Sequence, residues 1–188
     1  MQYNLTLPFS DETVMKLKAG DRVLLSGEIY VARDAAHERI VETVKNGDLP
    51  PFNIDNATVF YAGPAPTKPG EAIGVIGPTT SGRMDAYTPF MLKCGLRAMI
   101  GKGQRNDAVI AAMKQRKAVY FGATGGTAVI LSKAVLKSEI IAYEELGPEA
   151  ILRLQVKDMP LVVVIDCLGD SLYNIGQNHA REIISNGK

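Results

Sequence analysis

The stretch GVIGPTTSGRMDAYTPFMLKCGLRAMIGKGQ, residues Gly74 to Gln104, sets three hydroxyl groups, a glycine and an arginine between two structural elements. An apolar run over 73–76 predicts a buried strand, and a helix is expected over 85–93. The polar group Thr79-Thr80-Ser81-Gly82-Arg83 then falls where the strand passes into the helix. A helix N-terminus offers unpaired N–H groups, and an arginine offers a planar fork. The stretch therefore predicts a pocket for a small anion, either a carboxylate or a phosphate.

Strands followed by helices recur on both sides of this stretch, which favours an α/β fold with a mainly parallel central sheet. Alternating strands near both ends predict an additional antiparallel layer. The segment 128–136 fits either a strand or a helix, and 122–127 is expected to form a tight glycine-rich turn. Further strands are expected at 1–8, 22–31, 58–62, 96–100, 118–121, 140–143, 151–156 and 161–165, and further helices at 10–17, 35–45, 106–114 and 171–184.

Two residues mark local irregularities in these elements. Gly27 interrupts the strand over 22–31 and suggests a bulge or a hairpin corner. Pro89 falls inside the helix expected over 85–93. Proline is tolerated only in the first turn of a helix, so either Pro89 lies in that turn or the helix starts later than its pattern suggests.

Length and composition limit the class of protein. The 188 residues suit a single domain spanning 1–188, with 46% hydrophobic residues available for a core. The net charge of +1 comes without a basic block, which argues against a nucleic-acid partner. No signal peptide and no stretch of membrane-spanning length are present in the sequence, so we expect a cytoplasmic protein with no membrane partner.

The two cysteines, Cys94 and Cys167, stand far apart and outside any Cys-x-x-Cys or Cys-x-x-His pattern. A zinc or iron–sulfur site normally needs three or four ligands, so no metal site is expected in this chain alone. Both thiols are interpreted as small buried apolar groups.

Five polar residues are candidates for a binding site because they follow expected strands: Arg33, Thr79, Thr80, Arg83 and Lys102. Ligands of open α/β sheets gather at the carboxyl ends of strands. Three cations with two hydroxyl groups suit a small dianion. Simpler interpretations stay open: Arg33 as a solvated or ion-paired residue, the threonines as helix caps, and Lys102 as a turn residue.

Neighbouring residues are given structural roles. His37 is interpreted as a cap or core residue that could orient Arg33, and Asp85 as a favourable acid at a helix start. The glycines around Lys102 lack the spacing of a phosphate-binding loop.

Several segments together resemble the iron–sulfur-dependent fumarate and tartrate hydro-lyases. The resemblance is to their β subunit, which corresponds to the C-terminal domain of the single-chain fumarases. It covers nearly the whole chain, in the family's order. The segments that carry it are 27–37 (GEIYVARDAAH), 60–64 (FYAGP), 77–103, 122–127 (GATGGT) and 161–166 (LVVVID).

The resemblance implies a three-layer β/β/α swivelling domain. It also implies that Arg33, Thr79, Thr80, Arg83 and Lys102 line a dicarboxylate site, with Thr79, Arg83 and Lys102 taking part in catalysis. The family's [4Fe–4S] cluster is held by cysteines of an α subunit, so this chain resembles half of an active site. An α2β2 heterotetramer is the assembly that the resemblance implies.

The implied reaction is the reversible hydration of fumarate to L-malate. In the family, an open iron acts as Lewis acid, and the threonine matching Thr79 takes part in proton transfer with an acidic residue of the partner. L(+)-tartrate dehydration is an alternative, because both substrates are four-carbon dicarboxylates. A non-catalytic dicarboxylate-binding module is a further alternative.

Overall fold

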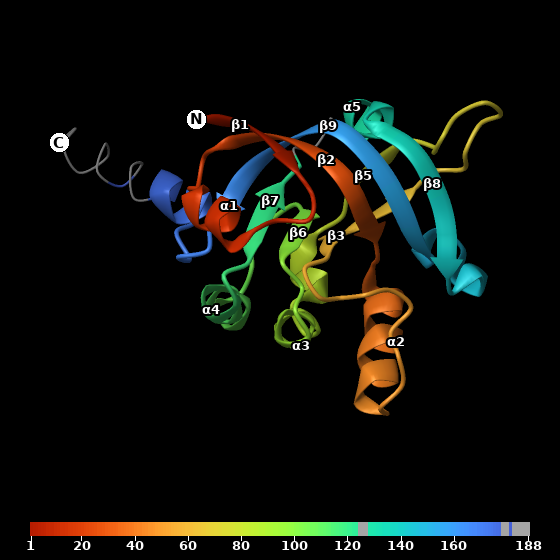
Figure 1. The fold of residues 1–188 in the computed structure, drawn as a ribbon, viewed down its shortest axis with the longest axis horizontal. Coiled ribbons are helices and arrows are strands. Elements are labelled where there is room, and N and C mark those ends of the chain that lie inside the picture. Colours follow the sequence, from red (N-terminus) through yellow and green to blue (C-terminus); the bar gives the residue numbers. More distant parts are fainter. Residues whose placement is uncertain (124–127, 178–180, 182–188) are drawn as a thin grey trace.

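The computed structural model describes residues 1–123, 128–177 and 181, and most of its strands join one seven-stranded sheet (Figure 1). The helices are α1 (Asp11–Lys16), α2 (Asp34–Lys45), α3 (Thr88–Lys93), α4 (Asp107–Arg116) and α5 (Ala128–Lys133), with 3-10 helices at Ser81–Met84 and Glu144–Glu149. The strands are β1 (Gln2–Thr6), β2 (Arg22–Val31), β3 (Thr58–Phe60), β4 (Ala62–Pro64), β5 (Ile76–Pro78), β6 (Ala98–Gly101), β7 (Val119–Gly122), β8 (Val135–Ala142) and β9 (Ile151–Ile165).

The large sheet is mainly parallel, as predicted. Its order is β1-β2-β3-β6-β7-β9-β8, and β1, β2, β3, β6 and β7 pair in parallel. The long strand β9 runs antiparallel to β7, β8 and β2. Because β9 pairs with both β7 and β2, the sheet closes on itself. A separate antiparallel pair, β4 and β5, completes the strands.

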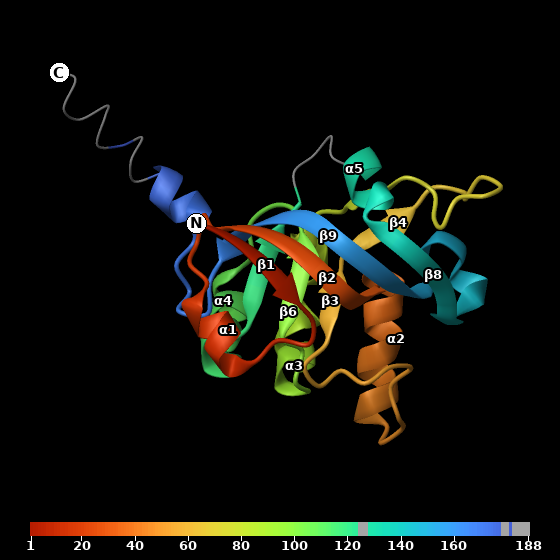
Figure 2. The ribbon, with the colours of Figure 1, turned by 45° about the horizontal axis from the view of Figure 1, so that its top comes forward.

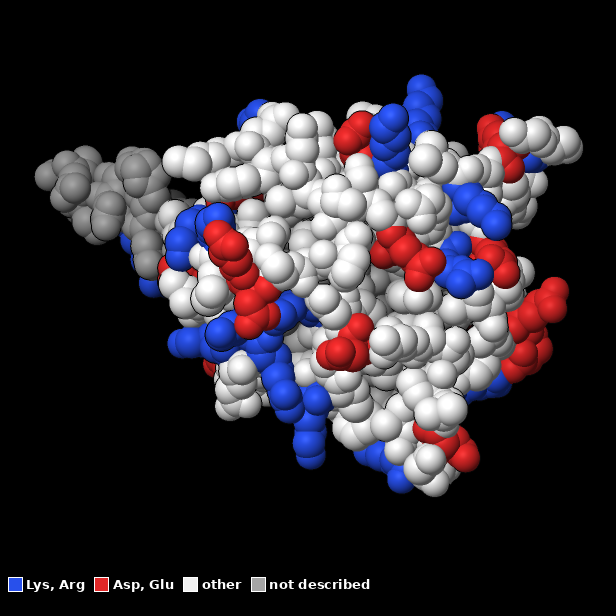
Figure 3. Space-filling view, viewed as in Figure 1, with Lys and Arg blue, Asp and Glu red and all other residues white. Residues whose placement is uncertain are grey.

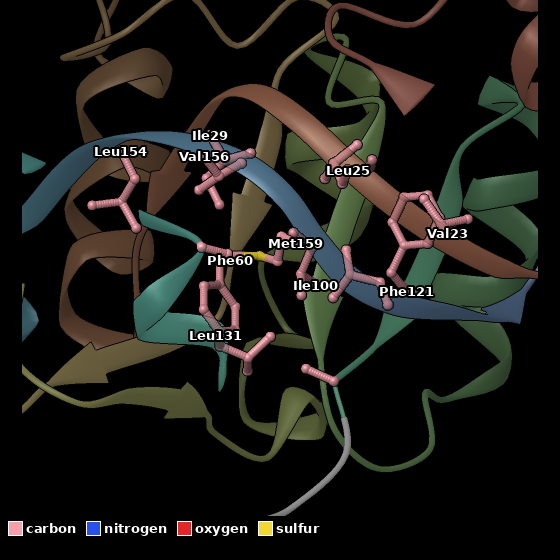
Figure 4. Close-up of a cluster of buried hydrophobic side chains, with 14 of the residues drawn as sticks. Val23, Leu25, Ile29, Phe60, Ile100, Phe121, Leu131, Leu154, Val156 and Met159 are labelled. Atoms are coloured by element: carbon pink, nitrogen blue, oxygen red, sulfur yellow. The ribbon is translucent and has the colours of Figure 1, made fainter. Parts of the chain in front are cut away.

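Two apolar clusters define layers in this arrangement. One fills the space between β2 and β9 on one side and β3, β6 and β7 on the other, where Leu25, Val156 and Met159 face Phe60, Ile100 and Phe121 (Figure 4). The other packs the opposite face of β3, β6 and β7 against α2, α3 and α4. These three helices lie together on one side of the strands (Figure 2). The α/β class is confirmed; the swivelling character stays a prediction.

Local signals account for many of the boundaries. The side chain of Ser10 accepts from the backbone N–H of Thr13 and begins α1, and Asn106 caps α4 in the same way through Val109. Gly27 has φ of +124° and sits at the register shift between β2 and β9. The predicted bulge is therefore confirmed, since few other residues adopt that backbone conformation.

Other expected boundaries are wrong. The strand expected over 73–76 is Ile76–Pro78, and the helix expected over 85–93 begins at Thr88. Pro89 then occupies the first turn of α3, where its missing N–H costs nothing. The strands expected over 151–156 and 161–165 are one continuous strand, β9.

Three further segments either combine a helix with a strand or lie partly outside the described residues. The segment 128–136 is neither all helix nor all strand, because α5 ends at Lys133 and β8 begins at Val135. The turn expected over 122–127 and the helix expected over 171–184 lie partly outside the described residues; the chain is helical over 172–177. In the part of the chain that the structure describes, no helix has the length and apolar character needed to cross a membrane.

Candidate active site

The carboxyl ends of four parallel strands form the edge on which the candidate residues lie. β2, β3, β6 and β7 run in the same direction, so the residues that follow them share one edge of the sheet. Arg33 lies two residues beyond β2, while Tyr61 and Lys102 directly follow β3 and β6. Ligands of α/β sheets collect at such an edge.

Thr79 and Thr80 reach the same edge by pairing with the ends of β3 and β6. The Thr79 N–H donates to the Tyr61 carbonyl over 2.7 Å, and the Lys102 N–H donates to the Thr79 carbonyl over 3.3 Å. The Ser81 N–H donates to the Lys102 carbonyl over 2.9 Å, and Thr80 and Lys102 form a parallel bridge. The structure therefore brings both threonines beside Lys102.

The helix expected to begin just after Arg83 is wrong in its start, and the small-anion pocket stays a prediction. The N–H groups of Thr79 and Ser81 are used by the sheet edge, and α3 begins only at Thr88. Thr80 precedes the 3-10 helix Ser81–Met84 without a side-chain cap.

Arg33 and Arg83 converge on one carboxylate, Asp34. Arg83 Nε donates to Asp34 Oδ1 over 2.8 Å, and Arg33 Nε lies 3.9 Å from Asp34 Oδ2. Arg33 Nη2 also lies 3.4 Å from Glu149 Oε1. The Arg83 side chain is 50% exposed and that of Arg33 is 22% exposed. Arg33 is thus ion-paired and partly accessible at once.

Gly63 makes room for the Arg33 guanidinium. A Cβ at residue 63 would stand 2.9 Å from Arg33 Nη1 and 3.2 Å from the Pro148 carbonyl. Real Cβ atoms essentially never come closer than 3.0 Å. The absence of a side chain at Gly63 is therefore part of how Arg33 is accommodated.

A buried tyrosine ties the threonine segment to the end of β6. The Ser81 and Tyr120 hydroxyl groups lie 2.9 Å apart, and Tyr120 Oη donates to the Gly103 carbonyl over 3.0 Å. Gly101 leaves the space for this contact, since a Cβ there would come within 2.0 Å of Ser81 Oγ. Burial raises the pKa of Tyr120, so its hydroxyl stays protonated and can donate.

Arg105 is the residue beneath this edge that the sequence did not single out. Its side chain is fully buried, and its Nε donates to Asp85 Oδ1 over 2.6 Å and its Nη2 to Thr88 over 2.7 Å. The guanidinium also lies over the rings of Tyr61 and Tyr120. Burial alone would lower the pKa of Arg105, but Tyr61 and Asp85 raise it above its ordinary value.

The helix-start role predicted for Asp85 is therefore wrong. Asp85 lies at the end of the 3-10 helix Ser81–Met84, where it pairs with Arg105 and accepts from the Asn106 N–H over 2.8 Å. The signal available in the sequence was only an isolated arginine between two polar residues, Gln104 and Asn106.

His37 is a core residue, one of the two roles predicted for it. Its ring is fully buried in α2 and packs edge-on against Tyr61. Nδ1 lies 2.8 Å from the Arg33 carbonyl oxygen, which can only accept, so Nδ1 carries the proton. Burial lowers the pKa of His37 to about 4, which keeps the ring neutral. His37 thus fixes the backbone of Arg33 rather than its guanidinium.

The cysteines belong to different parts of the structure. Cys94 ends α3 on the helix side, whereas Cys167 follows β9 and packs in the cluster inside the closed sheet. Burial raises the pKa of both thiols, which disfavours the thiolate form that binds metals. Among the described residues, no group of three or more His, Cys, Asp or Glu side chains is placed to hold a metal ion.

On the face shown in Figure 3, acidic and basic side chains are interspersed. At the sheet edge, two guanidinium groups share one carboxylate, and Thr79 and Thr80 are paired with Lys102. Such donors can hold a small dicarboxylate through charge-assisted hydrogen bonds.

Comparison with known proteins gives consistent matches. The family model for the fumarase C-terminus matches residues 1–176. Fumarate hydratase 2 of Leishmania major is 41% identical over 157 residues, which are 82% of this chain and 28% of that protein. The aerobic class I fumarate hydratase of Escherichia coli (strain K12) is 40% identical over 154 residues, covering 81% of this chain and 28% of that enzyme.

A shorter relative matches over almost its whole length. The putative L(+)-tartrate dehydratase subunit beta of Methanocaldococcus jannaschii is 36% identical over 179 residues, which are 92% of this chain and 91% of that protein. The chain thus spans less than a third of the two fumarate hydratases but nearly all of the tartrate dehydratase subunit. Since the family model covers all but the last 12 residues of the chain, the chain belongs to the fumarase C-terminus family of hydro-lyases.

Proposed function

We propose that this chain is the β subunit of a hydro-lyase that interconverts fumarate and L-malate, and that it works only with an α subunit. The observation that carries the proposal is the convergence of Arg33 and Arg83 on Asp34 at the edge where Thr80 pairs with Lys102. Membership of the fumarase C-terminus family supports the reaction class.

In this proposal the two arginines bind the carboxylates of the substrate. A guanidinium grips a carboxylate through two parallel hydrogen bonds, which fixes both position and orientation. Fixing the substrate in this way brings the reacting carbon to a defined place and lowers the entropic part of the barrier. Arg83, the more exposed of the two, has the freer access to a ligand.

Thr79 is the proposed proton-transfer residue. A threonine hydroxyl is a poor base unless its ionised form is stabilised, and Lys102 and Arg83 are the neighbouring cations that can do so. The backbone pairing of Thr79 with Lys102 supports this assignment. An acidic residue of the partner would complete the proton transfer, and Thr80 would contribute a hydroxyl to substrate binding.

The [4Fe–4S] cluster implied by the family does not fit the described residues of this chain. Cys94 and Cys167 lie in different apolar clusters and favour the thiol form. We therefore assign the cluster to the α subunit. An α2β2 assembly is the proposed stoichiometry.

L(+)-tartrate dehydration is the second candidate. It is favoured by one observation: the tartrate dehydratase subunit beta is a relative whose own length this chain nearly matches. The two fumarate hydratases of Leishmania major and Escherichia coli described above are 40–41% identical to the chain, against 36% for the tartrate dehydratase subunit. If the chain is not part of an enzyme, the alternative is a non-catalytic module that binds a dicarboxylate.

The test is an anaerobic assay of fumarate hydration by the chain alone and by the chain mixed with a reconstituted candidate α subunit. The proposal predicts activity in the mixture only, and the same assay with L(+)-tartrate decides between the substrates. Activity of the chain alone would refute the half-site arrangement. Tight binding of fumarate with no activity in any mixture would favour the binding module.

A further inference from the structure

We propose that Asp34 is a positioning residue that aligns the guanidinium groups of Arg33 and Arg83 for the substrate. The inference rests on the proposed function, because it concerns the same site. It adds a residue whose side chain does not itself contact the substrate but sets the direction of two side chains that do.

The contact geometry gives Asp34 a different oxygen for each arginine. Oδ1 accepts from Arg83 Nε over 2.8 Å, and Oδ2 faces Arg33 Nε at 3.9 Å. The second distance is an ion-pair distance rather than a hydrogen bond. Asp34 Oδ2 and Arg33 Nε are both buried atoms without a hydrogen-bond partner among the described residues. One carboxylate thus lies between the two cations.

The use of Nε decides which donors remain for a ligand. Asp34 holds Arg83 through Nε, and the two terminal nitrogens of Arg83 have no hydrogen-bond partner in the part of the chain that the structure describes. Those terminal nitrogens are the pair that can grip a substrate carboxylate from the end of the fork. Asp34 therefore fixes the fork without occupying its outer edge.

Asp34 is itself held by the fold. It is the first residue of α2, a 12-residue helix, where a carboxylate is favoured by the helix dipole. Its side chain is 28% exposed, less than that of Arg83. The short Asp34 side chain has few rotamers, whereas the long Arg83 side chain extends from a single 3-10 turn and is half exposed, so Asp34 determines where Arg83 points.

Glu149 is a second carboxylate near Arg33, and it differs from Asp34 in contacting only one of the two arginines. It lies 3.4 Å from Arg33 Nη2 and accepts from the Ala35 N–H over 3.0 Å, but it makes no ion pair with Arg83. Asp34 is thus the carboxylate common to both arginines. Changing Glu149 should disturb Arg33 and leave Arg83 in place.

The test compares Asp34→Asn with Asp11→Asn in the full chain. Asp11 is a matched control, because it also lies in the first turn of a helix, α1, and pairs with an arginine, Arg97. Each variant is mixed with the α subunit for steady-state kinetics with fumarate. Each variant is also labelled with ¹⁵N, and the Nε–H signals of Arg33 and Arg83 are recorded by NMR in the absence of the α subunit.

Alignment by Asp34 predicts that kcat falls about tenfold or more in Asp34→Asn while KM rises little, since misplaced donors cost turnover and the site keeps its cations. The Arg83 Nε–H signal should shift in Asp34→Asn, and only the Arg33 signal should shift in Glu149→Gln. Asp34→Glu should recover part of the lost kcat. Asp11→Asn should change neither kinetic parameter.

Two results would overturn the inference. An unchanged kcat with a lowered KM would show that Asp34 competes with the substrate instead of aligning its receptors. An unchanged kcat and an unchanged Arg83 signal would show that the contact does not orient Arg83. If the wild-type mixture has no hydro-lyase activity, the proposed function fails, and the Nε–H signals still decide whether Asp34 orients Arg83.

Discussion

Two arginine–aspartate pairs in this molecule share one geometry and differ in burial. Arg83 and Arg105 each donate through Nε to the Oδ1 of an aspartate, Asp34 or Asp85, over 2.8 and 2.6 Å. The Arg83 side chain is 50% exposed, whereas the Arg105 side chain is fully buried.

The difference lies in what the remaining guanidinium nitrogens do. Those of Arg105 contact Thr88 and the Met99 sulfur, so the whole group is committed to the interior. Those of Arg83 have no hydrogen-bond partner among the described residues, and the side chain is half exposed. The same ion pair is therefore structural where it is enclosed and available to a ligand where it is open.

Removing the buried arginine should give the largest loss of stability. Arg105→Met leaves Asp85 buried without its cation, which typically costs about 3–5 kcal/mol. The matched change at the exposed pair, Arg83→Met, should cost about 1 kcal/mol or less. Urea unfolding of the three proteins at pH 7 measures both losses. Equal losses of stability in the two variants would contradict the prediction that the buried pair stabilises the fold more than the exposed pair.

The buried His37 beneath Arg33 predicts a pH dependence. Burial lowers its folded-state pKa to about 4, so the unfolded chain binds more protons below pH about 6.5. The stability is fully present above that pH and falls as the pH drops toward 4, by about 2 kcal/mol at pH 5. Unfolding of the wild type and of His37→Gln at pH 7 and pH 5 isolates this term. Identical losses in both would contradict a neutral, buried His37.

A smaller loss of stability is expected when the hydroxyl group of the buried Tyr120 is removed. Tyr120→Phe removes the partner of Ser81 and of the Gly103 carbonyl, at a cost of about 1.5 kcal/mol. Tyr61→Phe is the control. Its hydroxyl has one long contact of 3.3 Å to Thr88, which also donates to the Met84 carbonyl. A larger loss in Tyr61→Phe than in Tyr120→Phe, measured by urea unfolding, would reverse this assignment.

The smallest effect is expected at the cysteines. Cys94→Ala and Cys167→Ala should leave the iron content of the mixture with the α subunit unchanged, because neither thiol belongs to the proposed site. Iron analysis after reconstitution measures this. Loss of iron in either variant would place a cluster ligand on this chain.

The residues at the exposed sheet edge could be predicted from the sequence better than the buried pair of Arg105 and Asp85. Arg33 and Lys102 could be placed because each follows an apolar run, and parallel strands carry such residues to one edge. The cap at Ser10 and the bulge at Gly27 depend on backbone rules that act within a few residues.

The buried ion pair depends on a contact between residues that are distant in the sequence. Asp85 and Arg105 are 20 residues apart, and nothing local distinguishes Arg105 from a solvated loop residue. The path of Thr79 and Thr80 could not be predicted either, because the Thr79 N–H donates to the Tyr61 carbonyl and the Ser81 N–H donates to the Lys102 carbonyl rather than opening a helix. Proline could have placed the start of α3, since Pro89 is tolerated only in a first turn.

The proposed site requires that Asp34 holds Arg83 through Nε and leaves the two terminal nitrogens of Arg83 open to the substrate. The direct measurement is the rate of fumarate hydration by the α mixture with wild-type chain, Arg83→Ala and Arg83→Lys. We predict a loss on the order of 100-fold or more in both variants with little change in urea unfolding, because an ammonium cannot replace a bidentate fork. A near-normal rate in either variant would contradict the account and remove Arg83 from the site.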